Sequence, residues 1–576
     1  MKASDYIADV LKEKNVPAVF ELVGGMITHM LDSLCVKQGV QVVSMHHEQG
    51  AAFAAEAAGR ITGVPGIAMA TSGPGATNLL TGIGSCYFDS SPSIFLTGQV
   101  NRHEQKGDRA IRQLGFQETD IVAMASPITK KATLVNDAQL LPSLLEDAFH
   151  IATHGRPGPV LLDIPMDVQR EEVDPAWLRS APVFAEAALD ERDLVAVREA
   201  LLRARKPLVL AGGGVRSGNA VQAFRDLVIT TNIPVVHSLM GVDLLPYHHP
   251  LNAGMIGSYG NRWANLALAE CDCLVVVGSR LDVRQTGADT AGFKENREIF
   301  HIDCEPGEIN NRVTGCHAIL SEVRPALQAL KELLYPVRNR FIETFAGWQA
   351  TIASLRSKWS DLDELKDVEG INPNLFMHEL SQVNGNAAAY VVDVGQHQMW
   401  AAQSLELNDR QRFLTSGGMG SMGFGLPAGI GAAVALRGQP VVVIAGDGSF
   451  QCNIQELQTV ARLGLPVKIV IINNQCLGMV RQFQESYFGG RYQSTMWGYS
   501  APNFEQVARA YGIPARTVSE PSEVRAASSW LHTDPTSPSL LQVMISPMAN
   551  AYPKLAFGKG MSSMEPQEKP VEMEST

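Results

Sequence analysis

The sequence is poor in charge and lacks the features that mark membrane, secreted or nucleic-acid-binding proteins. Only 18% of its 576 residues are charged, and 59 acidic against 47 basic side chains leave a formal net charge of −12. Such an acidic chain has no basic field for nucleic acid or an anionic membrane, so neither is expected as a partner. Hydrophobic residues make up 45% of the chain, which is enough for several cores and excludes a disordered protein.

Cysteine is scarce, and none of the eight cysteines belongs to a Cys-x-x-Cys pair. Scattered thiols in a long acidic chain indicate reduced residues and not a disulfide framework. No uncharged apolar run reaches the roughly 18 residues that a membrane helix needs. Residues 1–25 read as an amphipathic helix leading into a strand, without the apolar segment and cleavage site of a signal peptide. We therefore expect a cytoplasmic protein.

Short apolar runs alternate with helical patterns along most of the chain. At roughly 150 residues per domain the length favours three or four domains, and the alternation falls into blocks at residues 1–168, 190–340 and 370–553. Strands that alternate with helices predict right-handed βαβ units and parallel sheets. The expected fold class is α/β, with three doubly wound parallel-sheet domains. The strand-like runs are 42–46, 66–71, 93–99, 159–165, 207–214, 233–238, 273–279, 298–303, 390–395, 440–448, 467–474 and 539–545.

Three segments fall outside these blocks. Residues 169–189 are rich in proline, alanine and acidic residues and are interpreted as a linker. Residues 341–370 have a polar helical pattern and are interpreted as a second connector. Residues 554–576 have no periodicity, several charges and two prolines, which predicts a disordered tail.

The most informative segment is a strand–helix–strand unit with polar residues after both strands. One apolar run ends in Gly-Asp-Gly-Ser at 446–449, and the next ends in Asn473 and Asn474, so that Asp447 and Asn474 are 27 residues apart. Carboxylate and amide oxygens are hard ligands, and with one backbone carbonyl and two phosphate oxygens they suit a Mg²⁺ or Ca²⁺ site of octahedral type. Flanking glycines let backbone N–H groups approach a phosphate. A lone Gly-Asp-Gly-Ser is as often a turn, but the asparagine pair at this distance favours a metal site.

This spacing resembles the thiamin diphosphate motif of the thiamin-dependent enzymes. The resemblance implies that Asp447, Asn474 and the main-chain carbonyl of Cys476 ligate Mg²⁺. It also implies that Gly448 and Ser449 hold the diphosphate.

Two further segments fit this resemblance. Residues 394–397 follow a strand-like run and resemble the other diphosphate loop of the family, and residues 416–423 form a glycine-dense loop before a helix. In relatives this loop cups the aminopyrimidine, with the Gly420 carbonyl at the exocyclic amine and a bulky residue, here Met422, holding the cofactor bent. Met422 alone would be read as core filling. The implied contacts of thiamin diphosphate are Val394, Gly395, Gln396, His397, Gly420, Met422, Gly448, Ser449 and Met479.

Glu48 is the candidate for activating the cofactor. It follows a strand, at the start of the Ala-rich segment HHEQGAAFAAEAAGR. The thiazolium must lose a carbon-bound proton, which the exocyclic amine can take when a carboxylic acid in a dry pocket bonds a pyrimidine ring nitrogen. A lone glutamate at a helix start would only favour the helix dipole, but this segment resembles the acetolactate synthase branch, which favours catalysis. The helix has small side chains and is expected to pack closely against another subunit.

The middle block contains segments that look like the flavin contacts of the acetohydroxyacid synthase large subunit. The glycines at 212–214 would alone be a weak nucleotide loop or a turn, but residues 254–260, 278–287 and 301–303 follow in the same order and at similar spacing. The resemblance therefore implies bound FAD, mostly structural because carboligation has no net redox step. An empty vestigial site is the alternative. The implied FAD contacts are Arg156, Gly212, Gly213, Gly214, Gly254, Met255, Gly278, Arg280, Asp282, Arg284 and Asp303.

The resemblance to the acetolactate synthase family covers residues 1 to about 550. It implies a pyrimidine-binding, a central FAD-binding and a diphosphate-binding domain, and a homodimer or homotetramer with the active site between subunits. The implied reaction decarboxylates pyruvate and adds the two-carbon unit to a second carbonyl. Backbone donors near Gly25 would stabilise oxyanions, and Phe116 and Gln117 would line the reacting centre. Arg284 would bind the acceptor carboxylate, unless it contacts only FAD or forms a salt bridge.

Several positions depart from the biosynthetic enzymes of that family. Val283 replaces a second aspartate, Met166 replaces a lysine, Phe483 replaces a tryptophan that favours 2-ketobutyrate, and the loop at 101–109 is longer and more charged. These changes alter acceptor entry without touching activation, so an activated keto-sugar acceptor, giving a branched sugar, competes with a second pyruvate. A flavin-dependent pyruvate oxidase is a further alternative. A non-catalytic regulatory subunit is disfavoured, because Glu48 and the metal motif are both present.

Overall fold

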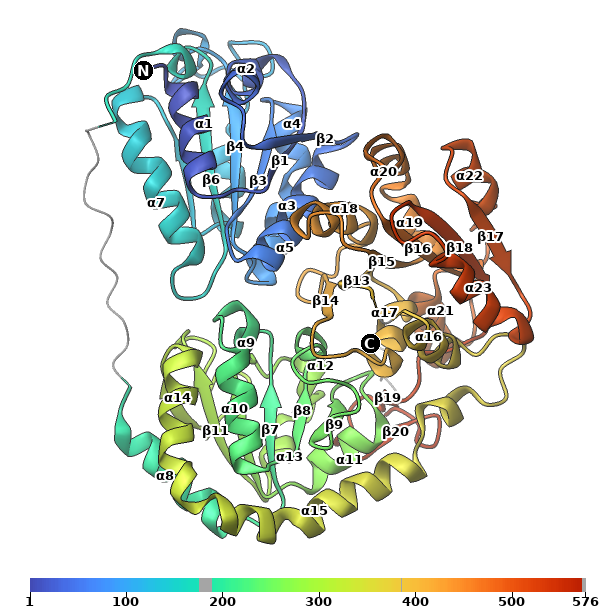
Figure 1. Cartoon of the computed structure of the whole chain (residues 1–576). Coiled ribbons are helices and arrows are strands. Elements are labelled where there is room, and N and C mark those ends of the chain that lie inside the picture. The colour runs from blue at the N-terminus through green and yellow to red at the C-terminus, as the bar shows by residue number, and fades with distance from the viewer. Residues whose placement is uncertain (176–188, 385, 572–576) are drawn as a thin grey trace.

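A computed structural model describes residues 1–175, 189–384 and 386–571 of the chain. It contains three six-stranded sheets, each flanked by helices, together with one two-stranded sheet (Figure 1). All strand pairs within the three large sheets are parallel, so the predicted α/β fold class is confirmed. Among the described residues, no helix combines the length and apolarity needed to cross a bilayer.

The first sheet lies within residues 18–165 and has the strand order β2-β1-β3-β4-β6-β5. Its strands are β1 (Ala18–Leu22), β2 (Gln41–Ser44), β3 (Gly66–Ala70), β4 (Ser93–Gln99), β5 (Lys131–Leu134) and β6 (Pro159–Pro165). Its helices are α1 (Ala3–Glu13), α2 (Thr28–Lys37), α3 (Glu48–Thr62), α4 (Pro74–Asn78), α5 (Leu80–Phe88), α6 (Ile121–Ala125) and α7 (Leu141–Thr153).

The central sheet has the order β12-β11-β10-β7-β8-β9, which is the order of dinucleotide-binding domains, with its switch point between β7 and β10. Its strands are β7 (Pro207–Ala211), β8 (Val235–His237), β9 (Asn252–Met255), β10 (Cys273–Val277), β11 (Glu298–Asp303) and β12 (His317–Leu320). Its helices are α8 (Glu191–Arg203), α9 (Gly214–Ser217), α10 (Val221–Thr231), α11 (Arg262–Glu270), α12 (Val283–Thr286), α13 (Thr290–Lys294) and α14 (Val323–Leu334).

The third sheet has the order β14-β13-β15-β16-β18-β17 and so repeats the topology of the first. Its strands are β13 (Ala389–Val392), β14 (Arg412–Thr415), β15 (Val441–Gly446), β16 (Val467–Asn473), β17 (Ala515–Val518) and β18 (Ser539–Met544). Its helices are α16 (Pro373–Gln382), α17 (Gln396–Ser404), α18 (Gly425–Ala435), α19 (Asp447–Gln451), α20 (Leu457–Leu463), α21 (Gly478–Tyr487), α22 (Phe504–Ala510) and α23 (Val524–Leu531).

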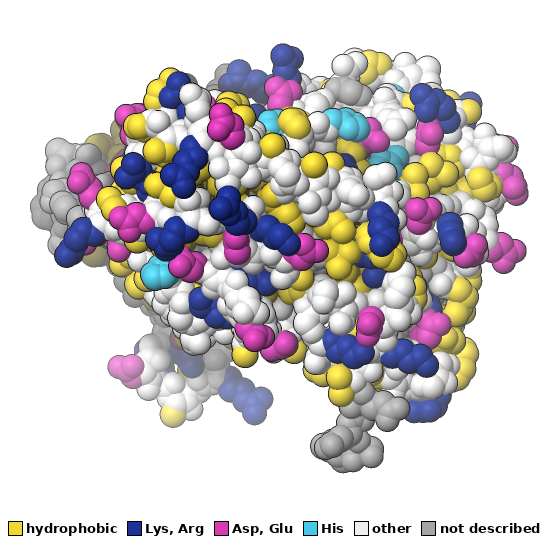
Figure 2. All heavy atoms as spheres, turned by 90° about the horizontal axis from the view of Figure 1, so that it is seen from below, with side chains coloured by type: hydrophobic (Ala, Val, Ile, Leu, Met, Phe, Trp, Pro, Cys, Tyr) yellow, Lys and Arg dark blue, Asp and Glu magenta, His cyan; other side chains and the backbone are white. Residues whose placement is uncertain are grey.

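The predicted helical connector is largely α15 (Arg338–Lys358), which runs under the central domain toward the third (Figure 1). Phe341, Phe345 and Trp348 on this helix are buried, so it packs on the central domain along one side. Figure 2 views the molecule from that end and shows acidic and basic side chains interspersed over the face. The predicted linker at 169–189 lies largely outside the described residues.

The prediction of a disordered tail is wrong for its described part. β19 (Lys554–Leu555) pairs antiparallel with β20 (Met564–Glu565), and the Lys554 ammonium lies 2.8 Å from the Glu565 carboxylate. Met561 and Met564 are buried in a core of the central domain. Two-residue strands and two isolated apolar side chains leave no periodicity in the sequence, which is why the pattern resembled disorder.

The Ala-rich helix α3, expected to pack against another subunit, packs closely against α18 of its own chain (Figure 1). The two backbones approach so closely that a Cβ built on Gly431 would lie 2.0 Å from the Ala54 carbonyl oxygen. Phe53 and Phe424 meet edge to face, with ring centroids 5.5 Å apart. One continuous core therefore spans the first and third domains.

This contact predicts that Gly431→Ala destabilises the protein, because the new methyl group would overlap backbone that cannot move aside. The matched control is Gly347→Ala in α15, where nothing lies within 4 Å of the added Cβ and helix propensity alone should give a small gain. Thermal unfolding should show a lower melting temperature for the first variant only. Equal melting temperatures for the two variants would contradict the contact.

A buried charge cluster joins the connector to the third and central domains. His378 on α16 lies 2.8 Å from Glu406 and 2.9 Å from Asp361, through its two ring nitrogens. His248 of the central domain lies 2.9 Å from the other Glu406 oxygen. Burial lowers the pKa of His378, but the bonds with Asp361 and Glu406 outweigh it and leave the pKa raised.

A histidine with a raised pKa gives stability that is full below its unfolded pKa of about 6.5 and is lost as the pH rises through the folded pKa. We therefore expect His378→Gln to lower the melting temperature clearly at pH 6, and the difference from wild type to shrink toward pH 9. The exposed His103→Gln serves as the control. A loss of equal size at both pH values would show that the imidazolium charge contributes nothing.

Candidate active site

The predicted metal ligands lie at the carboxyl edge of the third sheet. β15 and β16 are adjacent and parallel, with Gly446 in register with Ile472, so Asp447 and Asn474 leave neighbouring strand ends. Asp447 is buried and accepts a hydrogen bond from the Tyr499 hydroxyl at 3.1 Å. Burial raises the pKa of Asp447 to about 6, because it disfavours the charged carboxylate. A bound cation would favour the charged form and so lower that pKa.

A reversal of the backbone follows Asn474. Gln475 has a φ of +53°, and the Asn474 side-chain oxygen accepts the Cys476 N–H at 3.2 Å. The Asn474 amide donates to Gln396 on the neighbouring loop at 3.3 Å. The turn therefore holds Asn474 and the Cys476 backbone beside the end of β15, as the metal-ligand prediction requires.

The loop at 394–397 stands beside this pair, after β13. His397 is buried, burial lowers its pKa to about 3, and its Nε2 has no partner. A buried, neutral imidazole with a free nitrogen can donate an N–H to an anionic ligand. The Ser449 hydroxyl accepts the Gly446 N–H at 3.1 Å at the start of α19.

These residues fit thiamin diphosphate and Mg²⁺. A Cβ built on Gly448 would lie 2.5 Å from Leu477 Cδ2 and 3.5 Å from Met422 Cε, so only glycine leaves the backbone open to a ligand there. The described residues contain no cluster of three or more His, Cys, Asp or Glu side chains that could hold a metal alone. A divalent ion at this edge therefore needs oxygens from a ligand, as a diphosphate would supply. Met479 lies on α21, partly buried.

Sequence reasoning missed Asp393, which shapes the same edge. Its carboxylate accepts the backbone N–H groups of Val394 at 2.7 Å, Gly423 at 3.0 Å and Gly425 at 2.7 Å. Burial raises its pKa to about 6. One side chain thus joins the diphosphate loop to the end of the glycine-dense loop. Its signal in the sequence was an acidic residue directly after an apolar strand.

Glu48 lies at the carboxyl edge of the first sheet, as the first residue of α3. It is 6% exposed, and its Oε2 accepts a hydrogen bond from the Asn78 amide at 2.9 Å. Gly75 leaves room for it, since a Cβ there would lie 3.2 Å from Oε1. The hydrogen bonds of Glu48 within the described residues stay inside the first domain. The structure therefore does not join Glu48 to Asp447 of the same chain.

Three of the other predicted catalytic residues, Gly25, Phe116 and Gln117, belong to the first domain, whereas Arg284 belongs to the central domain. Gly25 follows β1 and has nothing within 4 Å of an added Cβ. Gln117 has a φ of +65° and packs against Gly73, which follows β3. Phe116 is 80% exposed, which is unusual for a large apolar side chain.

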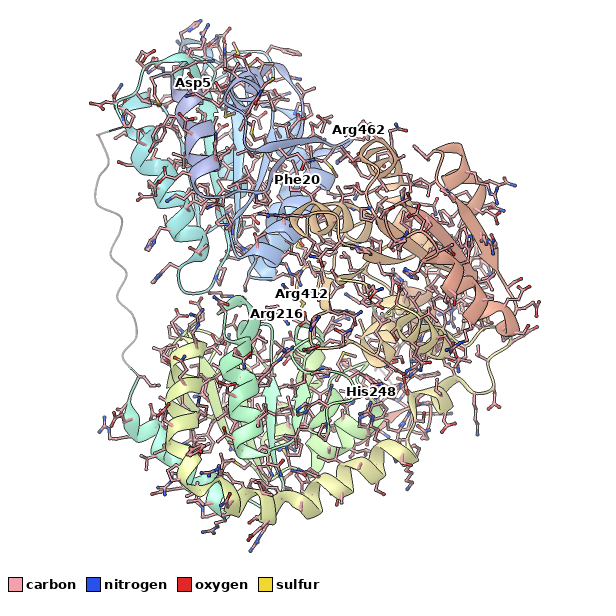
Figure 3. All side chains as sticks on the ribbon, in the orientation of Figure 1. Asp5, Phe20, Arg216, His248, Arg412 and Arg462 are labelled. Carbon is pink, nitrogen blue, oxygen red and sulfur yellow. The ribbon has the colours of Figure 1, made fainter. Side chains whose placement is uncertain are left out.

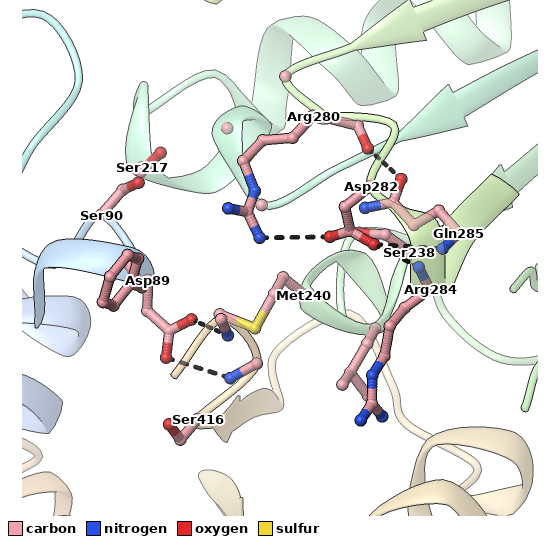
Figure 4. A pocket seen from close by; sticks show the side chains of 18 of the residues that line it. Asp89, Ser90, Ser217, Ser238, Met240, Arg280, Asp282, Arg284, Gln285 and Ser416 are labelled. Atoms are coloured by element: carbon pink, nitrogen blue, oxygen red, sulfur yellow. Dashed lines mark hydrogen bonds and ion pairs between the residues drawn. The ribbon is translucent and has the colours of Figure 1, made fainter. Parts of the chain in front are cut away.

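A cavity of about 490 Å³ lies where the three domains meet (Figure 4). It opens at the switch point of the central sheet, where Gly214 donates to the Gly278 carbonyl at 2.9 Å and the two glycine loops touch. Nine of the predicted flavin residues line it: Arg156, Gly213, Gly214, Met255, Gly278, Arg280, Asp282, Arg284 and Asp303.

Two predicted flavin residues, Gly212 and Gly254, are not among the lining residues. A Cβ on Gly212 would lie 2.1 Å from the Gly278 carbonyl oxygen, so this glycine permits the contact between the two loops. Gly254 has a φ of +94° and packs beside Trp263. Sequence reasoning missed lining residues from the other two domains, among them Asp89 and Gln398, because no local motif marks them.

The charged groups of the cavity are only partly paired with one another. The Arg156 guanidinium contacts Glu308 and Ser90, each at 2.8 Å, and Arg280 lies 3.2 Å from Asp282. Figure 4 shows the Arg284 guanidinium pointing away from that pair. Burial raises the pKa of Asp303 at the end of β11. A carboxylate at this place suits the hydroxyls of a ribose, and glycine backbones with nearby arginines suit a diphosphate.

Comparison with known proteins agrees with this geometry. Three family descriptions match in chain order: the thiamine pyrophosphate enzyme N-terminal TPP binding domain at residues 1–124, the central domain at 194–330 and the C-terminal TPP binding domain at 393–543. Thiamin diphosphate with Mg²⁺ and FAD are the usual cofactors of such enzymes.

The similarity to curated proteins extends over nearly the whole chain. The chain is 38% identical to the acetolactate synthase isozyme 2 large subunit of Escherichia coli K12, covering 98% of this chain and 99% of that protein. It is 36% identical to the acetolactate synthase large subunits of Porphyra purpurea and Lactococcus lactis, covering 97% and 96% of this chain and 94% of each relative. The chain therefore belongs to the acetolactate synthase large-subunit family of thiamin diphosphate-dependent enzymes.

Proposed function

We propose that this protein decarboxylates pyruvate and adds the two-carbon unit to a second pyruvate, forming acetolactate. The observation that carries the proposal is the pairing of Asp447 and Asn474 at adjacent strand ends beside the unpartnered His397 nitrogen. In a chain of this family, such an edge is suited to a metal diphosphate. Bound there, thiamin diphosphate would supply a carbon nucleophile and an electron sink.

Each side chain then has a defined task. Asp447, Asn474 and the Cys476 carbonyl would ligate Mg²⁺, while residues 448–449 and 394–397 would hold the diphosphate. Gly420 and Met422, on the loop after β14, would contact the aminopyrimidine. The Met422 side chain already lies against the 448–449 turn, which supports its place in the pocket.

Glu48 would hold a proton at the pyrimidine ring nitrogen, and we propose that a second copy of the chain provides it. Its recorded bonds stay within its own first domain, and Phe116 and Met422, both proposed site residues, are 80% and 40% exposed in the single chain. A homodimer or homotetramer would cover them. All eight cysteines are free thiols, which supports a cytoplasmic location.

We propose that FAD fills the 490 Å³ cavity. Gly213 and Gly214 begin α9 at the switch point and would face its diphosphate, and Asp303 would bind a ribose hydroxyl. Carboligation of two pyruvates moves no net electrons, so the flavin would be structural.

Pyruvate is the acceptor that the structure supports best. In the charged loop at 101–109, Arg102 donates to Asp167 at 2.8 Å and Arg109 donates to the Gln105 carbonyl at 3.0 Å. Arg102 is thus paired with an acid outside the loop, and Arg109 lies against its own loop backbone. Arg284 is exposed and would bind the carboxylate of the acceptor.

The test is to supply pyruvate as the only substrate, with thiamin diphosphate, Mg²⁺ and FAD, and to measure acetolactate. We expect turnover by wild type, and a loss of roughly a hundredfold or more in kcat for Glu48→Gln, because the amide cannot act as the acid. The exposed Glu13→Gln on α1 is the control.

Three outcomes would contradict the proposal. Turnover that requires an added keto-sugar would favour the branched-sugar reaction. Oxygen uptake with acetate as product would favour a pyruvate oxidase. Near-wild-type carboligation by Glu48→Gln would remove the role of that residue.

The metal site gives a separate prediction. Asp447→Ala removes a hard ligand, so we expect thiamin diphosphate and Mg²⁺ affinity to fall roughly tenfold or more. Cofactor content after gel filtration measures this, with the exposed Asp409→Ala as control. Unchanged thiamin content in Asp447→Ala would contradict the assignment.

A further inference from the structure

The loop at 416–423, called the glycine loop below, separates the flavin cavity from the proposed thiamin site. Residues 416–420 line the cavity, while Met422 on the other side reaches the 448–449 turn. Four of its eight residues are glycine, so the loop has few side chains of its own to fix its shape. Its conformation must therefore be set by partners outside it.

The main partner is Asp89, which follows α5 in the first domain of the same chain. Its two carboxylate oxygens accept the Gly417 N–H at 3.1 Å and the Gly418 N–H at 2.6 Å, as Figure 4 shows. A Cβ on Gly418 would lie 2.8 Å from the Phe88 carbonyl oxygen. The glycines thus let the loop backbone lie directly on the end of α5.

The base of the loop is held by a second set of contacts. Arg60 on α3 donates to the Thr415 carbonyl at 2.8 Å, and Arg412 donates to the Arg60 carbonyl at 2.9 Å. Arg412 also lies 3.3 Å from Asp243 of the central domain, close to Arg216 (Figure 3). The base of the loop is thus fixed by all three domains, and its end is fixed where Gly423 donates to Asp393. The freedom that remains lies between these points, where Asp89 binds Gly417 and Gly418.

The Asp89 carboxylate occupies an unfavourable place for a charge. Desolvation raises its pKa, and the fully buried Glu56 nearby, whose pKa is raised by burial to about 7, adds a second acid. A charged aspartate in the lining of this cavity lowers stability unless nearby hydrogen bonds or charges compensate for its desolvation. The charge of Arg60 and the two backbone N–H groups of the glycine loop supply that compensation.

We propose that Asp89 is a positioning residue that fixes the glycine loop and so couples the flavin cavity to the thiamin site. The inference rests on the proposed function. A group that fills the cavity would exclude water from the bonds of Asp89 to Gly417 and Gly418 and strengthen them. The same bonds hold Gly420 and Met422 where the pyrimidine needs them. Filling one cavity therefore favours binding at the other, and by linkage the effect is reciprocal.

The first test needs no cofactor. Asp89→Asn keeps one acceptor oxygen but turns an NH₂ group toward a backbone N–H, so one bond becomes a repulsion. Hydrogen exchange followed by mass spectrometry should show peptides covering 416–420 exchanging about tenfold faster or more in this variant, which corresponds to ~1.4 kcal/mol. Peptides from the sheets should be unchanged. Asp137→Asn, which also removes a carboxylate bonded to a backbone N–H, is the control.

Unchanged exchange of the loop in Asp89→Asn would overturn the proposal. Should that variant fail to fold, Asp89→Glu displaces the carboxylate by one methylene and gives the same comparison. Faster loop exchange in Asp89→Glu would support the anchor, and wild-type protection would overturn it.

The second test measures coupling. The Kd of thiamin diphosphate, at fixed Mg²⁺, is determined by tryptophan fluorescence with and without FAD. Wild type should bind thiamin diphosphate at least fivefold more tightly with FAD present, and Asp89→Asn should lose that dependence. Full FAD dependence in Asp89→Asn would overturn the coupling. A wild-type protein that binds neither cofactor would instead overturn the proposed function, while the exchange experiment would still decide whether Asp89 anchors the loop.

Discussion

The close contact between α3 and α18 is the constraint on which the rest of the site depends. The helices touch through alanine and glycine, so their backbones and not long side chains define the distance between the first and third domains. The first residue of α3 is Glu48, and the glycine loop leads directly into α18. The same helix pair therefore orients the proposed acid and the proposed pyrimidine contacts. Glu48 is also bonded within its own domain, which is why the proposed site includes a second copy of the chain.

The first and third sheets share one strand order although no repeat is visible in the sequence. A common topology places the switch point of each sheet between its first and third strands, so both domains present their loops at equivalent edges. The side chains on those loops differ between the two domains, and so do their proposed roles. The edge of the third domain holds hard oxygen ligands and an unpartnered imidazole, whereas the edge of the first holds a single carboxylate among small residues. The topology supplies position, and the loop residues supply the chemistry.

The sequence predicted the fold class and every strand in the middle of a sheet, because strands covered on both faces are continuous apolar runs. The strands it missed, β5, β9, β12, β14 and β17, all lie at sheet edges. Three of them, β5, β12 and β17, are partly exposed and so lack an unbroken apolar run. The proposed metal motif could be recognised in the sequence because Asp447 and Asn474 each follow an apolar strand at a spacing that suits adjacent strands. Asp89 was missed because it binds backbone N–H groups far away in the sequence, and such a contact leaves no local pattern. Asp393 directly follows an apolar strand, but its bonds to Gly423 and Gly425 are equally long-range, so its role could not be inferred.

Three partly or fully desolvated acids of this protein follow one physical logic. Desolvation raises the pKa of Asp393, Asp447 and Asp89. Each such charge lowers stability unless nearby hydrogen bonds or charges compensate for it. For Asp393 and Asp89 the compensation is already present, as backbone N–H groups from loops that need a fixed shape. For Asp447 the compensation comes from the Tyr499 hydroxyl and neighbouring backbone N–H groups. What separates the proposed metal ligand from the acids that only shape the site is its position, because Asp447 and Asn474 leave the ends of two adjacent strands.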